Sequence, residues 1–167
     1  MAELEILTYP NPILLAKAQA VARVSSPIQR LAHSMLETMH AASGIGLAAP
    51  QVGVEKRVIV VDVGEDPLVL VNPTIAAAEG EQLGLEGCLS LPDLVGEVSR
   101  AKWVTVKGLN GWGWPVRLEG EGLLARVLQH EIDHLDGILF VARVEDLTRL
   151  WKVSELSAKA TKEVAHI

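Results

Sequence analysis

Apolar positions mark two amphipathic helices in this chain of 167 residues. The first candidate begins at Ser26-Pro27, a good helix start, and ends at Ser43-Gly44. Its apolar residues recur at intervals of three and four: Ile28, Leu31, Met35 and Met39. The second candidate runs from about Gly122 to Asp136 and stops at Gly137. We predict a helix in each place.

The stretch between these helices has the composition of β-strands. Arg57–Val63 and Leu68–Val71 are rich in β-branched residues. Trp103–Val106 leads through Asn110-Gly111 to Trp114–Leu118, which is the pattern of a hairpin. Few helical signals interrupt this zone, so we predict mainly antiparallel pairing.

A charged segment follows the second helix, from Glu145 to the end of the sequence, and its pattern favours a further helix. The order helix, strands, helices indicates an α+β fold. We therefore expect mainly antiparallel β-sheets packed around the helix at 122–136, with a C-terminal helix. The length suits one domain over residues 1–167.

Composition and charge remove several classes of function. The chain is 49% hydrophobic and 22% charged, which argues against disorder, and no apolar run reaches the ~18 residues that a bilayer span needs. The net charge of -6 argues against nucleic-acid binding as the main activity. We expect neither nucleic acid nor membrane as a partner. The acidic N-terminal residues lack a basic region followed by an apolar stretch, so we expect a cytoplasmic location.

Candidate chemistry lies on the second predicted helix, in the stretch QHEIDH. His130 and His134 are a little over one helical turn apart, so they point to the same side with Glu131 beside them. In the pattern H-E-x-x-H, two imidazoles bind a divalent metal and the Glu handles the proton of a bound water. The alternative is a pair of core histidines satisfied by hydrogen bonds. That alternative leaves Glu131 unexplained, because an unpaired buried carboxylate is costly.

A catalytic metal site of this kind needs a third ligand and an open fourth position. The extended zinc-peptidase pattern would place that ligand at position 140, but Phe140 cannot ligate. Glu155 is a weak candidate, since its segment has the pattern of a solvated surface helix. Cys88, the single cysteine, lies in LEGCLSLP, where glycine and proline indicate a turn. A cysteine on such a loop can reach a metal on a helix, although a buried filler and a nucleophile are also open for Cys88.

A third stretch, GIGLAAPQVG, runs from Gly44 to Gly53 after the first helix. Alone it is consistent with a helix stop and a loop. In order along the chain, however, GIGLAAPQ, EGCLS and QHEIDH resemble the three signature motifs of the peptide deformylase family. The similarity also covers YPNP near the start, NPTI from Asn72, Arg100, and DGILFVARV after the second helix.

This resemblance implies hydrolysis of the N-formyl group from the N-terminal formylmethionine of newly made polypeptides, with release of formate. It places one divalent metal ion per chain on Cys88, His130 and His134. Fe2+ is the expected ion, with Ni2+, Co2+ or Zn2+ as alternatives. A metal-bound water would attack the formyl carbon, with Glu131 as general base and then general acid.

The resemblance also assigns residues around the substrate. Gln51, through its side-chain amide, and Leu89, through its backbone N–H, would stabilise the oxyanion. Gly44 and Gly46 would leave the backbone around Ile45 open, so that a peptide can pair with it as an added strand. An apolar pocket for the methionine side chain is expected to be lined by Ile45, Leu123 and Val127.

The expected partner is an N-formylmethionyl peptide. Weak association with the ribosome, as in some family members, is left open, although the mixed charges of the C-terminal segment favour a solvated helix. Two other classes of function compete. A structural metal module would need a fourth protein ligand, yet the remaining histidines lie in the first helix and at the end of the sequence. A non-enzymatic relative would be expected to have lost Glu131, Cys88 or Gln51, and all three are present.

Overall fold

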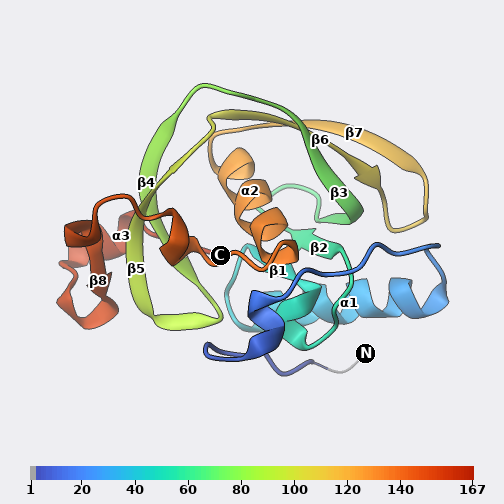
Figure 1. The fold of residues 1–167 in the computed structure, drawn as a ribbon, viewed down its shortest axis with the longest axis horizontal. Helices are drawn as coiled ribbons and strands as arrows, with labels where there is room; N and C mark the ends of the chain where they lie inside the picture. Colours follow the sequence, from blue (N-terminus) through green and yellow to red (C-terminus); the bar gives the residue numbers. More distant parts are fainter. Residues whose placement is uncertain (1–2) are drawn as a thin grey trace.

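The computed structural model describes residues 3–167. Its strands surround one largely buried helix, α2 (Leu123–Leu135) (Figure 1). The other α-helices in this range are α1 (Ser26–Ala41) and α3 (Ala158–Glu163). Short 3-10 turns connect the elements: η1 (Pro12–Leu15), η2 (Ala49–Val52), η3 (Phe140–Arg143), η4 (Leu147–Arg149) and η5 (Val153–Glu155). None of the helices in residues 3–167 is both long and apolar enough to cross a membrane.

The larger of two sheets is antiparallel throughout, with the strand order β1-β2-β3-β6-β7. Its strands are β1 (Gly46–Ala48), β2 (Val58–Val61), β3 (Leu68–Glu79), β6 (Trp103–Leu109) and β7 (Pro115–Glu121). At the tip of the β6-β7 hairpin, the Asn110 side chain accepts hydrogen bonds from the amides of Trp112 and Trp114. β1 forms one edge of this sheet.

The second sheet has the order β8-β5-β4-β9. Its strands are β4 (Gln82–Cys88), β5 (Leu91–Arg100), β8 (Leu150–Lys152) and β9 (Ala165–His166). The pairs are antiparallel, except that β9 runs parallel to β4. β9 brings the last residues of the chain to the centre of the molecule, close to α2 and β1 in Figure 1.

Helix α2 packs against strands of both sheets, including β1, β7 and β5. Its Val127 and Leu128 are fully buried, in one cluster with Ile59 of β2 and Val106 of β6. Helix α1 covers a second cluster through Met35 and Met39, which have no exposed surface. The apolar stripes that predict both helices are therefore the faces that these helices bury.

The predicted α+β class, with antiparallel sheets around the motif-bearing helix and a C-terminal helix, is confirmed. Both long helices and the hairpin lie within a few residues of their predicted positions. The C-terminal helix is shorter than predicted, because the segment from Glu145 also contains 3-10 turns and the strands β8 and β9. β3 extends beyond its predicted end, and the long β4-β5 pair was not predicted as strands. The prediction of a single domain stays a prediction.

Candidate metal centre and catalytic site

Three candidate metal ligands converge beside α2. One donor atom from each of Cys88, His130 and His134 lies within 4.8 Å of the other two, and all three residues are buried. The Sγ atom of Cys88 is 3.4 Å from Nε2 of His134. Cys88 is the last residue of β4, whereas the two histidines lie one turn apart on α2. The structure thus brings together the three residues that the sequence predicts as ligands.

Glu86, two residues before Cys88 on β4, fixes the orientation of His130. Burial alone would raise the pKa of the Glu86 carboxyl, but hydrogen bonds from Arg100 and His130 outweigh it and hold that pKa well below its ordinary value. The ionised Glu86 accepts a hydrogen bond from Nδ1 of His130 at 2.8 Å. This tautomer leaves the lone pair of Nε2 free to bind a metal.

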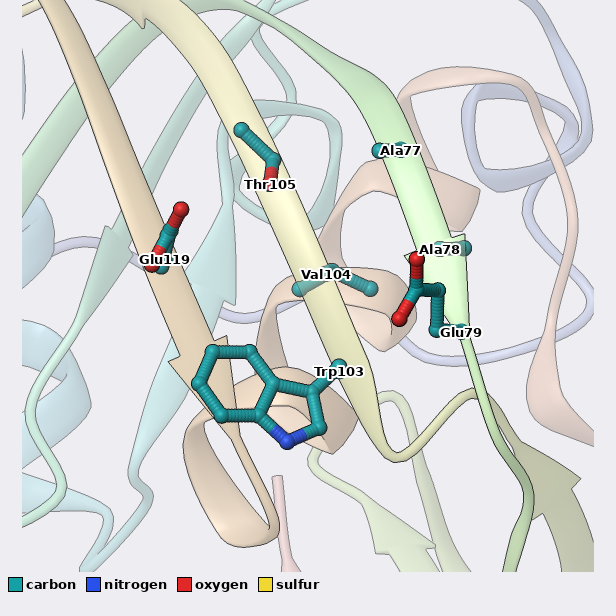
Figure 2. A pocket seen from close by; sticks show the side chains of 7 residues that line it. All are labelled: Ala77, Ala78, Glu79, Trp103, Val104, Thr105 and Glu119. Atoms are coloured by element: carbon teal, nitrogen blue, oxygen red, sulfur yellow. The ribbon is translucent and has the colours of Figure 1, made fainter.

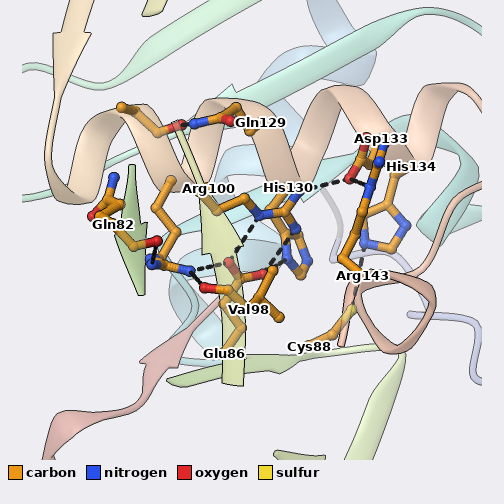
Figure 3. Close-up of polar contacts among 12 residues, drawn as sticks. Gln82, Glu86, Cys88, Val98, Arg100, Gln129, His130, Asp133, His134 and Arg143 are labelled. Atoms are coloured by element: carbon orange, nitrogen blue, oxygen red, sulfur yellow. Dashed lines mark hydrogen bonds and ion pairs between the residues drawn. The ribbon is translucent and has the colours of Figure 1, made fainter. Parts of the chain in front are cut away.

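Two buried arginines hold the same carboxylate, as part of the network in Figure 3. Arg100 donates to both oxygens of Glu86 at 2.9 Å, and Arg126 donates to Oε2 at 2.5 Å. Arg100 also donates to Asp133 on α2 at 2.7 Å, and Arg143 donates to both oxygens of Asp133. Ion pairs therefore join β4, β5 and α2 on the side of His130 that faces away from Cys88.

Glu131 is fully buried, and within residues 3–167 neither of its oxygens has a hydrogen-bond partner. Burial, followed by the negative charge of Glu86, raises its pKa well above the ordinary value. Gly46 of β1 permits this placement. A Cβ atom at Gly46 would lie 2.5 Å from Oε2 of Glu131 and 2.8 Å from Cγ1 of Val127. The glycine is thus required by the close packing of β1 on α2.

Burial shifts the pKa values of Cys88 and His134 towards their uncharged forms. Burial, and then the charge of Glu131, raises the pKa of the Cys88 thiol. Burial, and then His130, lowers the pKa of His134 well below its ordinary value. Nε2 of His130 and Nδ1 of His134 are buried without a hydrogen-bond partner among the described residues. Neutral imidazoles and a thiol that a cation would deprotonate are the donor set that suits a divalent transition metal.

Gln51 lies in η2, and its fully buried side chain is held by three contacts. Its Oε1 accepts a hydrogen bond from the amide of Ala48 at 2.9 Å. Its Nε2 donates to Oγ of Ser90 at 3.1 Å and approaches Sγ of Cys88 at 3.7 Å. The predicted oxyanion donor therefore points its N–H groups at the ligand loop.

Leu89, the other predicted oxyanion donor, follows Cys88 directly. Its backbone N–H donates to the carbonyl oxygen of Ile167 at 3.0 Å. The N–H of Ile45, predicted to pair with a peptide, donates to the carbonyl of His166 at 3.3 Å. Both groups are therefore engaged by the last residues of the chain, a placement that no pattern in the sequence predicts.

The remaining predicted substrate residues divide into two groups. Val127 is fully buried beside Gly46, and a Cβ atom at Gly44 would lie 2.8 Å from Cδ1 of Leu89, so these positions border the site. Leu123 is 47% exposed at the start of α2. It is separated from His130 by almost two helical turns and is not part of the buried cluster.

Sequence reasoning missed two residues of the centre, Glu86 and Arg126. Each is a charged residue within an apolar context: Glu86 between Leu85 and Gly87 in a strand, Arg126 within the run LLARVL of a helix. A charge on the buried stripe of an element needs a partner, and that signal could have paired these two residues.

A hollow elsewhere on the surface lacks comparable chemistry. It lies over β3, β6 and β7 and is lined by Trp103, Thr105, Glu79 and Glu119, with small side chains between them (Figure 2). Its two carboxylates are exposed on β3 and β7, on either side of β6, and do not converge on a buried donor. None of its lining residues is a predicted site residue.

The fold and the buried centre define a class. Two histidines one helical turn apart and a cysteine, next to a buried glutamate that has no hydrogen-bond partner among residues 3–167, form the arrangement of a metal-dependent hydrolase.

Comparisons with known proteins identify the family within that class. The family model described as polypeptide deformylase matches residues 3–150. The peptide deformylase of Syntrophomonas wolfei is 51% identical over 153 residues, covering 92% of this chain and all of the relative. The solved peptide deformylase of Thermus thermophilus is 47% identical with a TM-score of 0.83, covering 87% of this chain and 88% of that one. The peptide deformylase of Synechococcus elongatus, solved in complex with actinonin, is 44% identical with a TM-score of 0.84, covering 87% and 81%. This chain belongs to the peptide deformylase family, a family of hydrolases.

Proposed function

We propose that this protein hydrolyses the N-formyl group from the N-terminal formylmethionine of newly made polypeptides and releases formate. One observation carries the proposal: Glu131, fully buried and without a hydrogen-bond partner among residues 3–167, lies on the same helix as His130 and His134, which meet Cys88. A carboxylate in that position is costly unless it has a proton to exchange with a reacting group. Membership of the family supplies the reaction.

A divalent ion on Cys88, His130 and His134 completes the site that we propose. When bound, it supplies an electrophile and lowers the pKa of a water molecule. A thiolate and two neutral imidazoles leave a formal charge of +1, softer than in a site of histidines alone. Fe2+ is the ion we propose, with Ni2+, Co2+ and Zn2+ as alternatives.

Glu131 moves the proton in the proposed reaction. It would take a proton from water and later return it to the departing amine. Gly46 lets β1 pack directly against this carboxylate. Gln51 and the N–H of Leu89 would donate to the oxyanion that forms at the formyl carbon, and each such donor contributes ~2.7–4 kcal/mol in other hydrolases.

The peptide part of the substrate would pair with the backbone at Ile45, as an added strand beside the edge strand β1. The methionine side chain would bind beside Val127. Full burial of a methionine side chain stabilises binding by ~1.5–3 kcal/mol. Leu123, at the exposed start of α2, would contribute at the rim. A cytoplasmic location, where nascent chains are made, accords with this substrate, and weak association with the ribosome remains part of the proposal.

Release of formate tests the proposal. The comparison is kcat/KM for formyl-Met, acetyl-Met and formyl-Asp peptides, with a metal assay on the same sample. We expect one metal ion per chain and a strong preference for formyl-Met. The acetyl group is larger and less electrophilic, and aspartate would lose its hydration beside Val127. Similar values for all three peptides would contradict the proposed site.

A further inference from the structure

The last residues of the chain lie where the proposed substrate would bind. Residues 164–167 pass between β4 and the segment before β1, and they bond to both. On one side, Ile167 N–H donates to Gly87 O at 3.2 Å, and Leu89 N–H donates to Ile167 O at 3.0 Å. On the other side, Ile45 N–H donates to His166 O at 3.3 Å. The segment thus bridges the two sheets as an inserted strand.

Without this segment each sheet would present an open edge at the candidate centre. β1 is the edge of the larger sheet, and β9 is the edge of the smaller one. Removing β9 would expose β4, which carries Glu86 and Cys88. Open strand edges beside a site accept extended peptides through main-chain hydrogen bonds. The slot therefore has the form of a peptide-binding groove, and it is filled by this chain.

The side chain of Ile167 anchors the segment. It is fully buried and belongs to the same cluster as Val127, where the methionine side chain is proposed to bind. Ala165, two residues before Ile167, packs against the same cluster, whereas His166 between them is exposed. Alternate side chains of the segment thus face the core, as in a bound strand.

Little room is left beside the segment. The cavity next to Cys88 is about 190 Å³, and Ile167 and His166 form part of its lining. Drug-sized ligands occupy pockets of roughly 300–1,000 Å³. A peptide substrate and the segment therefore compete for one space. The family model ends at residue 150, so its match does not include this segment.

We infer that residues 164–167 are an intramolecular competitor that occupies the peptide-binding slot and must leave before a substrate binds. This inference rests on the proposed function for the identity of the substrate, although occupancy of the slot can be measured without turnover. A tethered segment acts at an effective concentration of about millimolar. Substrate affinity is then reduced by the fraction of molecules with an open slot, so KM rises while kcat at saturation is unchanged.

The first experiment measures binding alone. A chain shortened by residues 164–167 is loaded with metal and titrated with the peptide Val-Ala-His-Ile, labelled at its N-terminus, by fluorescence anisotropy. We expect the shortened chain to bind the peptide and the 167-residue chain to bind it at least ~10-fold more weakly, since an occupied slot leaves about a tenth or less of molecules open. Equal binding, or no binding to a shortened chain that is still folded by its thermal melting, would overturn the inference.

The second experiment measures formate release from a formyl-Met peptide. The shortened chain and Ile167→Asp should both show a KM lowered ~10-fold or more with kcat unchanged, because a buried carboxylate at position 167 is disfavoured and opens the slot. Added Val-Ala-His-Ile should raise the KM of the shortened chain competitively. Lys162→Ala, on the exposed face of α3, is the matched control and should leave KM unchanged.

The two experiments separate the two proposals. Peptide binding without formate release in any variant would refute the proposed function and leave the occupied slot standing. Formate release with the same KM in the shortened chain, Ile167→Asp and the 167-residue chain would refute the competitor. If the shortened chain does not fold, Ile167→Asp and the difference in amide hydrogen exchange at Ile45 and Leu89 decide: faster exchange at both amides supports occupancy, and unchanged exchange contradicts it.

Discussion

The two sides of the centre on α2 differ in whether their polar atoms have hydrogen-bond or ion-pair partners. On the side of Asp133 and Nδ1 of His130, the carboxylates and guanidinium groups have charged partners at 2.5–3.1 Å. On the other side, neither oxygen of Glu131 has a hydrogen-bond partner among residues 3–167, and Nε2 of His130 has none there either. Glu86 on the paired side and Glu131 on the other side are both fully buried, so burial does not explain the difference.

This difference indicates that one side of α2 supports the structure of the centre and the other side carries out its chemistry. Buried charges that are fully paired hold a structure in one arrangement, and removing one partner leaves the others uncompensated. Buried polar atoms without partners cost free energy and are retained where they bind a ligand or exchange a proton. The paired side therefore positions His130, and the unpaired side is where a metal and a substrate are expected.

Breaking the paired side at its centre should have the largest effect. Glu86→Ala would leave Arg100, Arg126 and His130 without their shared carboxylate. We expect the free energy of unfolding to fall by ~3–5 kcal/mol, as when one partner of a buried ion pair is removed. Metal affinity should fall ~10- to 100-fold, because His130 loses the group that fixes its tautomer.

Chemical denaturation and metal titration measure these two effects for Glu86→Ala. Glu81→Ala is a suitable control, because Glu81 is an exposed acidic residue just before β4 and pairs with Ser99 rather than with an arginine. A Glu86→Ala protein as stable as the parent would show that the network does not support the centre.

The unpaired side should respond in activity rather than in stability. Glu131→Gln is expected to lower kcat by ~10²–10⁴-fold, the usual contribution of a general acid-base group. It should retain the metal, because Glu131 is not among the ligands. Its stability should be similar, since Gln has the same shape and the buried position keeps an unpartnered polar group. Formate release, metal content and thermal melting check the three statements, and loss of the metal would make Glu131 a ligand.

Glu86 and Glu131 also show how much of the site can be predicted from the sequence. The spacing of His130, Glu131 and His134 predicts one face of a helix, and the structure places them there because α2 buries that face. Cys88 is predicted less directly, since the distance between a loop and a helix depends on the fold. Glu86 and Arg126 come together from β4 and α2, a contact that no local pattern specifies.

The strands that sequence reasoning missed have a physical explanation. β4 and β5 contain Gly84, Gly87 and Gly96, which weaken the pattern of a strand. Tertiary packing needs two of them: a Cβ atom at Gly84 would lie 3.0 Å from the guanidinium of Arg126, and one at Gly96 would lie 2.7 Å from Val144. These glycines are therefore explained by contacts with residues that are distant in sequence. The same holds for β9. It lies in a charged C-terminal segment, and nothing in that segment's pattern predicts its pairing with β4.

A third prediction concerns Gly46, where strand β1 packs on helix α2 beside Glu131. Gly46→Ala would place a Cβ atom against both Glu131 and Val127. We expect it to destabilise the fold by ~1–3 kcal/mol, the usual effect of overpacking, and to lower activity by displacing the carboxylate. Thermal melting and formate release measure both changes. Gly64→Ala is a control with open space around it, although its backbone conformation also disfavours a side chain. Full activity in Gly46→Ala would show that β1 can move away without affecting Glu131.

The smallest effect is expected where the paired side reaches solvent. Arg100 and Arg143 both bind Asp133, at 2.7 and 2.9 Å, but their side chains are 4% and 47% exposed. Water can replace Arg143, so Arg143→Ala should cost no more than ~1 kcal/mol, as for other surface ion pairs. Arg100→Ala should cost several times more, because Glu86 and Asp133 would both lose a buried partner. Parallel urea denaturation of the two variants measures the ratio. Equal losses would mean that charge alone holds Asp133, whereas a large difference would show that burial makes this side of α2 a rigid support for His130.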